Sequence, residues 1–198
     1  MIGIYLGEQN SGKTLSMVYT AYKYFLNDYD IYSNVKLQFP YTKLTKELLQ
    51  EYTEGQKQFK KSIFLIDEGY LFFDSRSFGS KSVKIFTYFL LQTSKRNINL
   101  YISAQYFNTL EKRLRENTFF QCFCNRTLFN PKTQQFNSIN DNSRFLKKEE
   151  NEQLYIKQSY LMKKNIDGMF PSYYGKIFYL KATSKLFSLY DTTELLAI

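Results

Sequence analysis

A chain of 198 residues, 43% hydrophobic and 23% charged, is long enough for one α/β domain with a sizeable core and short for two. It contains no histidine, which excludes serine–histidine or cysteine–histidine catalysis and histidine-ligated zinc; any general base is a carboxylate, a lysine or a tyrosine. A net charge of +9, spread along the chain rather than gathered in a tail, favours a polyanionic partner.

The first apolar run, IGIYL at residues 2–6, is typical of a buried parallel strand. It leads directly into a loop at residues 7–14 that fits the phosphate-binding pattern G-x-x-x-x-G-K-[ST]. Residues 13–25 then carry apolar side chains at three- and four-residue spacings, which predicts an amphipathic helix. Strand, loop and helix in this order predict nucleotide binding.

The residue types in the loop indicate how a nucleotide is held. Successive backbone N–H groups form an anion-binding nest at a helix N-terminus. Lys13 is expected to reach the β- and γ-phosphates, and the Thr14 hydroxyl to bind Mg²⁺. The expected nucleotide-binding residues are Gly7, Glu8, Gln9, Asn10, Ser11, Gly12, Lys13 and Thr14.

The next predicted elements are a strand at residues 30–35, a helix at 45–52 and a strand at 62–68, SIFLIDE, that ends in two carboxylates. We expect this strand to lie beside the phosphate loop, so that Asp67 holds Mg²⁺ through its water shell. Glu68 is placed to orient and deprotonate a water molecule for attack on the γ-phosphate. Kinases must exclude water, so the Asp–Glu pair favours hydrolysis.

A helix is predicted at residues 82–96, a third core strand at 98–105 and a short helix at 108–117. Asn108 is the expected N-cap of the last helix, with Glu111 three residues on, close to a capping box. The third strand ends at Gln105, which is expected to contact both the γ-phosphate and the attacking water.

Three arginines are candidates for a residue that completes a neighbouring subunit's site. Arg96 ends the helix before the Gln105 strand, and Arg113 and Arg115 lie off the apolar face of the following helix and are expected to project. In ring-shaped motors such an arginine stabilises transition-state charge in trans. Solvated surface charge is the alternative for each of them.

Beyond residue 118 the α/β alternation stops. An antiparallel hairpin is predicted from residues 119–129 and 134–139, with NPKT between them. The stretch 141–170 is left unassigned. A pair of short strands is predicted at 174–190. Cys122 and Cys124 form a lone C-x-C, which is too small for a four-ligand metal site and favours packing.

The predicted organisation is a single domain, 1–198, with a phosphate-loop core over about 1–120 and a β-rich extension over about 121–198. The sequence has neither a signal-peptide pattern nor an apolar run of about 18 residues, which predicts a cytoplasmic protein that does not insert into a membrane.

With the phosphate loop, IFLIDE, SKRNINLYISAQ and LEKRLREN in this order, the chain resembles the FtsK–HerA superfamily of DNA-pumping ATPases. Within it, the chain looks most similar to the Zot-like and viral genome-packaging ATPases, and LFSLYDTTE at 186–194 is similar to the YDT element that ends many Zot-like domains. The resemblance covers most of the chain and is specific over the first 120 residues.

The resemblance implies an α/β P-loop NTPase fold of the RecA/ASCE type, with a central, mostly parallel sheet flanked by helices and a β-rich C-terminal extension. It implies ATP and Mg²⁺ as cofactors, and Arg96 as an arginine-finger candidate. It carries over as ATPase residues Lys13, Thr14, Asp67, Glu68 and Gln105.

The expected function is an ATP-hydrolysing translocase that packages double-stranded DNA into a viral capsid. It would act in the host cytoplasm as a pentameric or hexameric ring that docks transiently on a capsid vertex or portal. Zot-like relatives of filamentous phages continue into a membrane-spanning segment, whereas this chain stops at Ile198, which favours packaging over extrusion. The alternatives left open are an extrusion or conjugation ATPase, a small P-loop nucleoside kinase, and a nucleotide-gated structural subunit.

Overall fold

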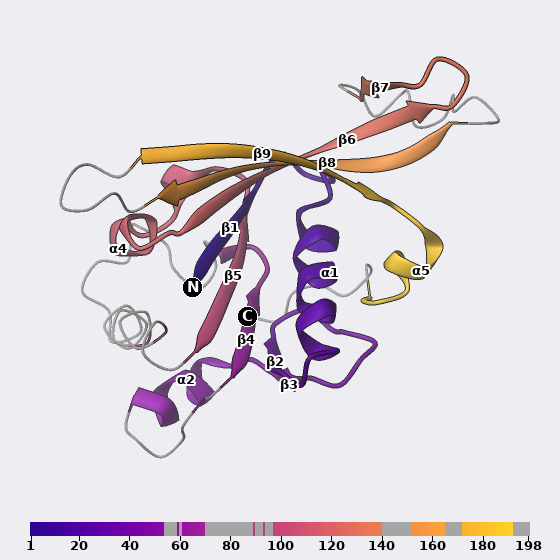
Figure 1. Cartoon of the computed structure of the whole chain (residues 1–198). Coiled ribbons are helices and arrows are strands. Elements are labelled where there is room, and N and C mark those ends of the chain that lie inside the picture. The colour runs from indigo at the N-terminus through magenta and orange to yellow at the C-terminus, as the bar shows by residue number, and fades with distance from the viewer. Residues whose placement is uncertain are drawn as a thin grey trace.

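A computed structural model of the chain describes residues 1–53, 61–69, 97–139, 152–164 and 172–191, together with Phe59, Phe89 and Thr93. One sheet runs through the molecule in the order β3-β2-β4-β5-β1-β6-β8-β9, and β7 pairs with β6 (Figure 1). The predicted α/β architecture with a mostly parallel sheet and a β-rich extension is confirmed.

The parallel part of the sheet contains β1 (Ile2–Leu6), β2 (Asp30–Ser33), β3 (Thr42–Lys43), β4 (Ser62–Ile66) and β5 (Ile98–Ala104). Every residue of β1, β4 and β5 is buried, as expected for short apolar runs covered on both faces. The register pairs Leu6 with Ala104 and Ile66 with Ile102, so these strands end together at one edge of the sheet.

Helices cover both faces of this parallel sheet. On one face, α1 (Lys13–Phe25) packs Leu15, Val18 and Ala21 against side chains of β1, β4 and β5. On the other face, α2 (Lys46–Thr53) and α4 (Lys112–Glu116) bury leucines against the alternate side chains of the same strands (Figure 1). The continuous apolar strands therefore face a helix on each side.

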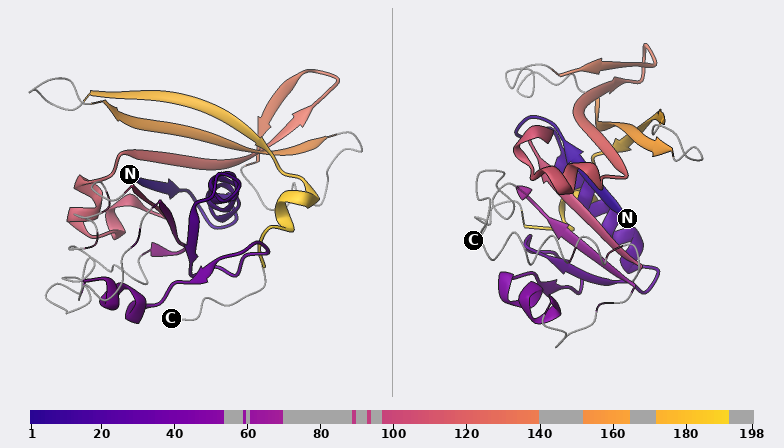
Figure 2. Two further views of the ribbon diagram at one scale, coloured as in Figure 1. Left: turned by 60° about the horizontal axis from the view of Figure 1, so that its bottom comes forward. Right: turned by 90° about the vertical axis from the view of Figure 1, so that its left-hand side faces the viewer.

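The antiparallel extension contains β6 (Phe120–Asn130), β7 (Gln135–Ser138), β8 (Gln153–Lys164) and β9 (Ser172–Lys181). The first part of β6 pairs parallel with β1, and almost its whole length pairs antiparallel with β8. Figure 2 shows the end of β6 and its partner β7 projecting from the α/β core. The extension is therefore a continuation of the core sheet through a shared strand.

The predicted helix at 108–117 begins later than expected. Phe107–Thr109 form a 3₁₀ turn, and α4 begins only at Lys112. The cap is Glu111, whose carboxylate accepts from Leu114 N, and not Asn108. Leu110 is fully buried, and its extended backbone (φ −83°, ψ 150°) places the side chain in the core and interrupts helical geometry.

One prediction for the last third of the chain needs correction, and a stretch that was left unassigned contains a strand. The unassigned stretch 141–170 contains the whole of β8, which pairs along most of its length with β9. The expected pair of short strands at 174–190 is one strand, β9, followed by α5 (Ser184–Phe187). Thr183 is the reason that the strand ends there, because its side chain accepts from Leu186 N and caps the helix.

The helix predicted at 82–96 lies outside the described residues apart from Phe89 and Thr93, both of them buried and helical. Across the part of the chain that the structure describes, no helix is both long and apolar enough to cross a lipid bilayer.

Candidate nucleotide-binding site

The loop between β1 and α1 has the backbone geometry that its two glycines permit. Gly7 has φ +146°, and a Cβ there would lie 2.6 Å from the Cys124 carbonyl oxygen. Gly12 has φ +92°, and a Cβ there would lie 2.5 Å from Ile156 Cδ1. Both positions therefore exclude side chains for two reasons, positive φ and close approach of β6 or β8.

The concave side of this loop is suited to an anion. Gly12 precedes α1 and offers no side-chain cap, so the first-turn N–H groups of a 13-residue helix face the loop without a capping side chain. Lys13 is buried, and its Nζ donates to the Glu8 carbonyl oxygen at 2.8 Å. Ser11 Oγ is buried without a hydrogen-bond partner in the described part of the chain, which leaves a polar atom available to a phosphate oxygen.

Thr14 and Asp67, 53 residues apart in sequence, meet across the mouth of the loop. Thr14 Oγ1 lies 3.0 Å from both carboxylate oxygens of Asp67 and donates to them. A hydroxyl and a carboxylate are hard oxygen ligands of the kind that Mg²⁺ prefers beside phosphates. The residues present therefore fit a nucleotide-bound Mg²⁺, with Thr14 and Asp67 as the protein's contribution.

Two residues that the sequence reasoning missed hold Asp67 in place. Asn34, directly after β2, accepts from Asp67 N at 2.8 Å and donates to Asp67 O at 3.0 Å, so its amide pairs with both backbone groups. Ser103, fully buried in β5, donates from Oγ to Asp67 Oδ1. The strand order explains both contacts, because β4 lies between β2 and β5.

Glu68 follows Asp67 in a left-handed conformation, with φ 52°. Its backbone N–H donates to Ser103 Oγ at 2.9 Å, so one serine hydroxyl ties together the two carboxylate residues. Positive φ is uncommon for a residue with a β-carbon and is held here by that buried bond. Glu68 lines the same cavity as Thr14 and Asp67.

The Gln105 strand, β5, is the neighbour of the Asp67 strand, as predicted. β5 also lies between β4, which precedes Asp67, and β1, which leads into the phosphate loop. The expectation that the Asp67 strand lies directly beside the loop strand is therefore wrong. Gln105 is the first residue after β5 and is exposed at the edge where the loop begins. Its side chain is not among the described walls of the cavity.

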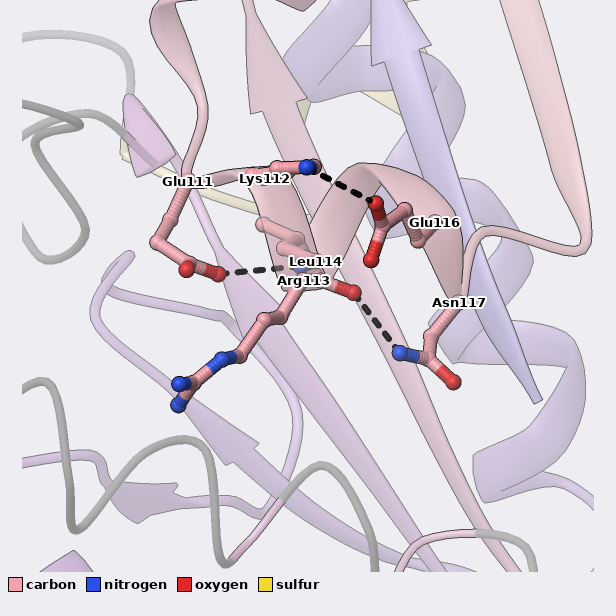
Figure 3. Close-up of polar contacts among 6 residues, drawn as sticks. All are labelled: Glu111, Lys112, Arg113, Leu114, Glu116 and Asn117. Atoms are coloured by element: carbon pink, nitrogen blue, oxygen red, sulfur yellow. Dashed lines mark hydrogen bonds and ion pairs between the residues drawn. The ribbon is translucent and has the colours of Figure 1, made fainter.

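The arginine candidates have different environments. Arg96 lies outside the described residues. Arg113 is exposed, and its side chain extends away from α4 (Figure 3). Arg115 is half-buried, with Nε enclosed and without a hydrogen-bond partner in the described part, so it projects less freely than its helical position suggested.

Figure 3 also shows how α4 is held at both ends. The Glu111 carboxylate accepts from Leu114 N at 3.1 Å, and Asn117 Nδ2 donates to Arg113 O at 2.7 Å. The exposed ion pair between Lys112 and Glu116, at 3.7 Å, contributes little. These contacts fix the short helix that carries Arg113.

A cavity of about 640 Å³ adjoins the loop, with Thr14, Asp67 and Glu68 in its wall. Its wall also includes residues that sequence reasoning did not assign to the site, among them Lys36, Arg126, Leu154, Phe187, Tyr190 and Asp191. Burial, and secondarily the negative charge of Asp67, raises the pKa of Tyr190 to about 12, so its phenol is neutral at physiological pH. A C-terminal segment therefore contributes to the pocket.

Cys122 and Cys124 are buried free thiols, with their sulfur atoms 3.8 Å apart. Burial raises the pKa of the Cys122 thiol, so it is protonated. Among the described residues no three acidic, cysteine or histidine side chains cluster as a metal site. This environment is consistent with the packing role predicted for the pair.

No protein-family model matches the chain, and no curated protein matches its sequence. Among solved structures, it is similar to the N-terminal domain of zonular occludens toxin from Neisseria meningitidis, with a TM-score of 0.59 and 19% identity over 96% of this chain and 98% of that one.

The chain is also similar to the genome packaging NTPase B204 from Sulfolobus turreted icosahedral virus 2. In the complex of B204 with AMPPCP the TM-score is 0.54 at 12% identity, over 92% of this chain and 98% of that chain. In its complex with sulfate the TM-score is 0.51 at 14% identity, over 92% and 96%. At such identities the likeness establishes a shared fold, the one that the sequence resemblance implied.

Proposed function

We propose that the protein hydrolyses ATP and couples hydrolysis to the movement of double-stranded DNA. The observation that carries the proposal is the meeting of Thr14 and Asp67 at the mouth of the phosphate loop, with Glu68 next to them in the same cavity. Support also comes from the shared fold with an NTPase that was solved with AMPPCP.

Each residue has a distinct task in this proposal. The loop amides and Lys13 bind the phosphates, and Thr14 and Asp67 would hold the metal, Asp67 through its water shell. When bound, Mg²⁺ would neutralise charge on the β- and γ-phosphates. Glu68 accepts a proton from water as that water attacks the γ-phosphorus, while the bond to the bridging oxygen breaks and ADP leaves. Ser103 and Asn34 keep Asp67 and Glu68 at fixed positions through the bonds described above.

Phosphate release by three variants tests the enzymatic part. Lys13→Ala should bind ATP poorly and release no phosphate. Glu68→Gln should bind Mg-ATP normally and release phosphate about 10²–10⁴-fold more slowly, the range lost with a general base. Glu116→Gln, which removes an exposed carboxylate of α4, is the control and should match the wild type. Unchanged hydrolysis in Glu68→Gln would exclude Glu68 as the base.

The charge of the antiparallel strands supports a nucleic-acid partner. The strands β6 to β9 contain no aspartate or glutamate in their described residues, and they contain the basic residues Arg126, Lys157, Lys163, Lys164, Lys176 and Lys181. An excess of positive charge attracts a phosphate backbone irrespective of base sequence. A translocating motor needs contacts of that kind.

We propose further that the active form is a ring of five or six subunits, as the resemblance to ring-shaped DNA-pumping ATPases implies. Arg113, exposed on α4, and Arg96 are the candidates for an arginine supplied in trans. Mixing Arg113→Ala with Glu68→Gln subunits tests this directly. Hydrolysis recovered in the mixture, at sites that take Glu68 from one subunit and Arg113 from the next, would support Arg113. No recovery would exclude it.

Packaging into a capsid, with docking on a vertex or portal, is supported by the fold shared with the packaging NTPase B204. A virion-extrusion ATPase is the second candidate, favoured by the likeness to the zonular occludens toxin domain over 96% of the chain. Co-purification with capsid vertex proteins would support packaging, and co-purification with a membrane-embedded assembly complex would support extrusion.

A further inference from the structure

The cavity at the phosphate loop is larger than a triphosphate requires. Loop residues, Asp67 and Glu68 form only part of the wall of its 640 Å³. The wall also includes Arg126 of β6 and Leu154 of β8 from the sheet, and Phe187 and Tyr190 from the C-terminal segment. Apolar and aromatic walls with a few polar groups are typical of a site for an organic ligand rather than for an inorganic anion.

The sheet side of this wall is the inner face of β6 and β8. Arg126 pairs directly with Ile156, and Leu128 with Leu154, in the antiparallel register. Side chains two apart on a strand share a face, so Leu154 and Ile156 both point inward. Ile156 also packs against Gly12, which makes this surface continuous with the phosphate loop.

The opposite wall is the segment 183–191, here called the strap. Antiparallel backbone contacts hold it to the segment after β2: Gln38 N donates to Leu189 O at 2.8 Å, and Asp191 N donates to Lys36 O at 3.0 Å. The Lys36 ammonium lies 3.5 Å from the Asp191 carboxylate. In Figure 1, α5 of the strap lies beside α1, the helix that begins at the loop.

Phe187 has an aromatic ring that the fold leaves available. Its neighbours Leu186 and Leu189 pack against the core, whereas Phe187 is 41% exposed and lines the cavity. An exposed aromatic face beside a cavity is a surface on which a nucleobase can stack. The strap thus presents one aromatic ring in the wall of the cavity that adjoins the phosphate loop.

We infer that the strap and the inner face of β6 and β8 form the nucleoside subsite of this pocket, with Phe187 stacking on the base of ATP. The inference rests on the proposed function, because it takes the loop as the site of the triphosphate. It adds a specific role for a C-terminal segment that is about 170 residues from the loop in sequence. Stacking of the base on Phe187 would then raise the affinity for ATP, and Phe187 would not contact the atoms that react.

The absence of tryptophan from the chain allows a direct test. In Phe187→Trp the single tryptophan should be quenched by Mg-ATP, because the base stacks on it, and unaffected by magnesium tripolyphosphate, which has no base. Phe123→Trp is the matched control, since Phe123 is 42% exposed on the outer face of β6. Its fluorescence should respond to neither ligand.

Calorimetric titration of Phe187→Ala completes the test. Mg-ATP affinity should fall roughly tenfold or more, as expected for loss of one base–aromatic stack, with tripolyphosphate affinity unchanged. Equal loss for both ligands, or no loss for either, would overturn the subsite. If wild-type protein binds neither ligand, the proposed function fails instead. Thermal unfolding of each variant shows whether a loss reflects misfolding.

Discussion

Removing the Ser103 hydroxyl tests whether the positions of Asp67 and Glu68 depend on their buried neighbour. Ser103 is fully buried, and its Oγ donates to the Asp67 carboxylate and accepts from Glu68 N at 2.9 Å. A bond to a charged group contributes about 1.5–3 kcal/mol and one to a backbone amide about 0.5–1.5 kcal/mol. Ser103→Ala should therefore lower the free energy of unfolding by about 2–4.5 kcal/mol.

The same change should impair hydrolysis. Residues that orient a metal ligand typically affect metal affinity or activity by about 10- to 100-fold. Phosphate release measured against Mg²⁺ concentration should show a higher half-saturating Mg²⁺ and a lower maximal rate.

Thr118→Ala is the control for this experiment. Thr118 is buried and donates to Leu114 O at 2.9 Å, but it precedes β6 at the edge of the sheet opposite the loop. It should lose about 1 kcal/mol of stability and keep its Mg²⁺ dependence. If Ser103→Ala also kept a wild-type Mg²⁺ profile, the Ser103 hydroxyl would have no part in placing Asp67.

Gly12→Ala should abolish nucleotide binding and destabilise the protein by about 1–3 kcal/mol, because φ at this position is +92°. Adding Ile156→Ala removes the side chain that the new Cβ would meet but leaves the backbone strain, so calorimetry should show no recovery of binding. The pKa of Tyr190 in the folded protein is about 12, above the ordinary value of 10.0. The stability that the neutral phenol contributes is therefore complete below pH 10 and is lost as pH rises through 12. The urea concentration at the unfolding midpoint of the wild type should accordingly fall between pH 10 and 12. Tyr190→Phe should show a shallower fall, and an identical slope would contradict the assignment. Three lysines lie on the outer face of the extension: Lys157, Lys163 and Lys181. Alanine at all three positions should weaken the salt dependence of DNA binding, measured by fluorescence anisotropy. The slope of log affinity against log salt concentration should fall by about 0.9 for each DNA phosphate that a lysine no longer neutralises.

Local patterns predicted the parts of the site that lie on contiguous residues. The loop at 7–14, the buried strand before it and the Asp–Glu pair after β4 each have a signature within a few positions. These segments form the elements expected of them because every residue of the strands is buried and local preference agrees with the fold.

What could not be predicted depends on which strands are neighbours. Asn34 and Ser103 act on Asp67 only because β4 lies between β2 and β5, and strand order has no local signature. A small polar residue inside the apolar run LYISA was the one available signal for Ser103. The strap reaches the pocket through pairing between Leu37 and Tyr190, more than 150 residues apart.

The stretch that forms β8 was left unassigned although its pattern was readable. Leu154, Ile156, Tyr160 and Met162 recur at even spacings with Lys157 and Ser159 at alternate positions, the period-2 pattern of a half-buried strand, and the last three of the four pack on the core side. Lysines within the strand and the charged stretch before it obscured the alternation. The α4 boundary was wrong because burial of Leu110 outweighed the local capping preference at Asn108.

Steady-state phosphate release, with and without linear double-stranded DNA, tests the central proposal most directly. The account predicts Mg²⁺-dependent release by the wild type that rises when linear duplex is added, and almost none by Glu68→Gln under either condition. Release that ignores DNA, or that persists at the wild-type rate in Glu68→Gln, would contradict the account of a DNA-moving ATPase.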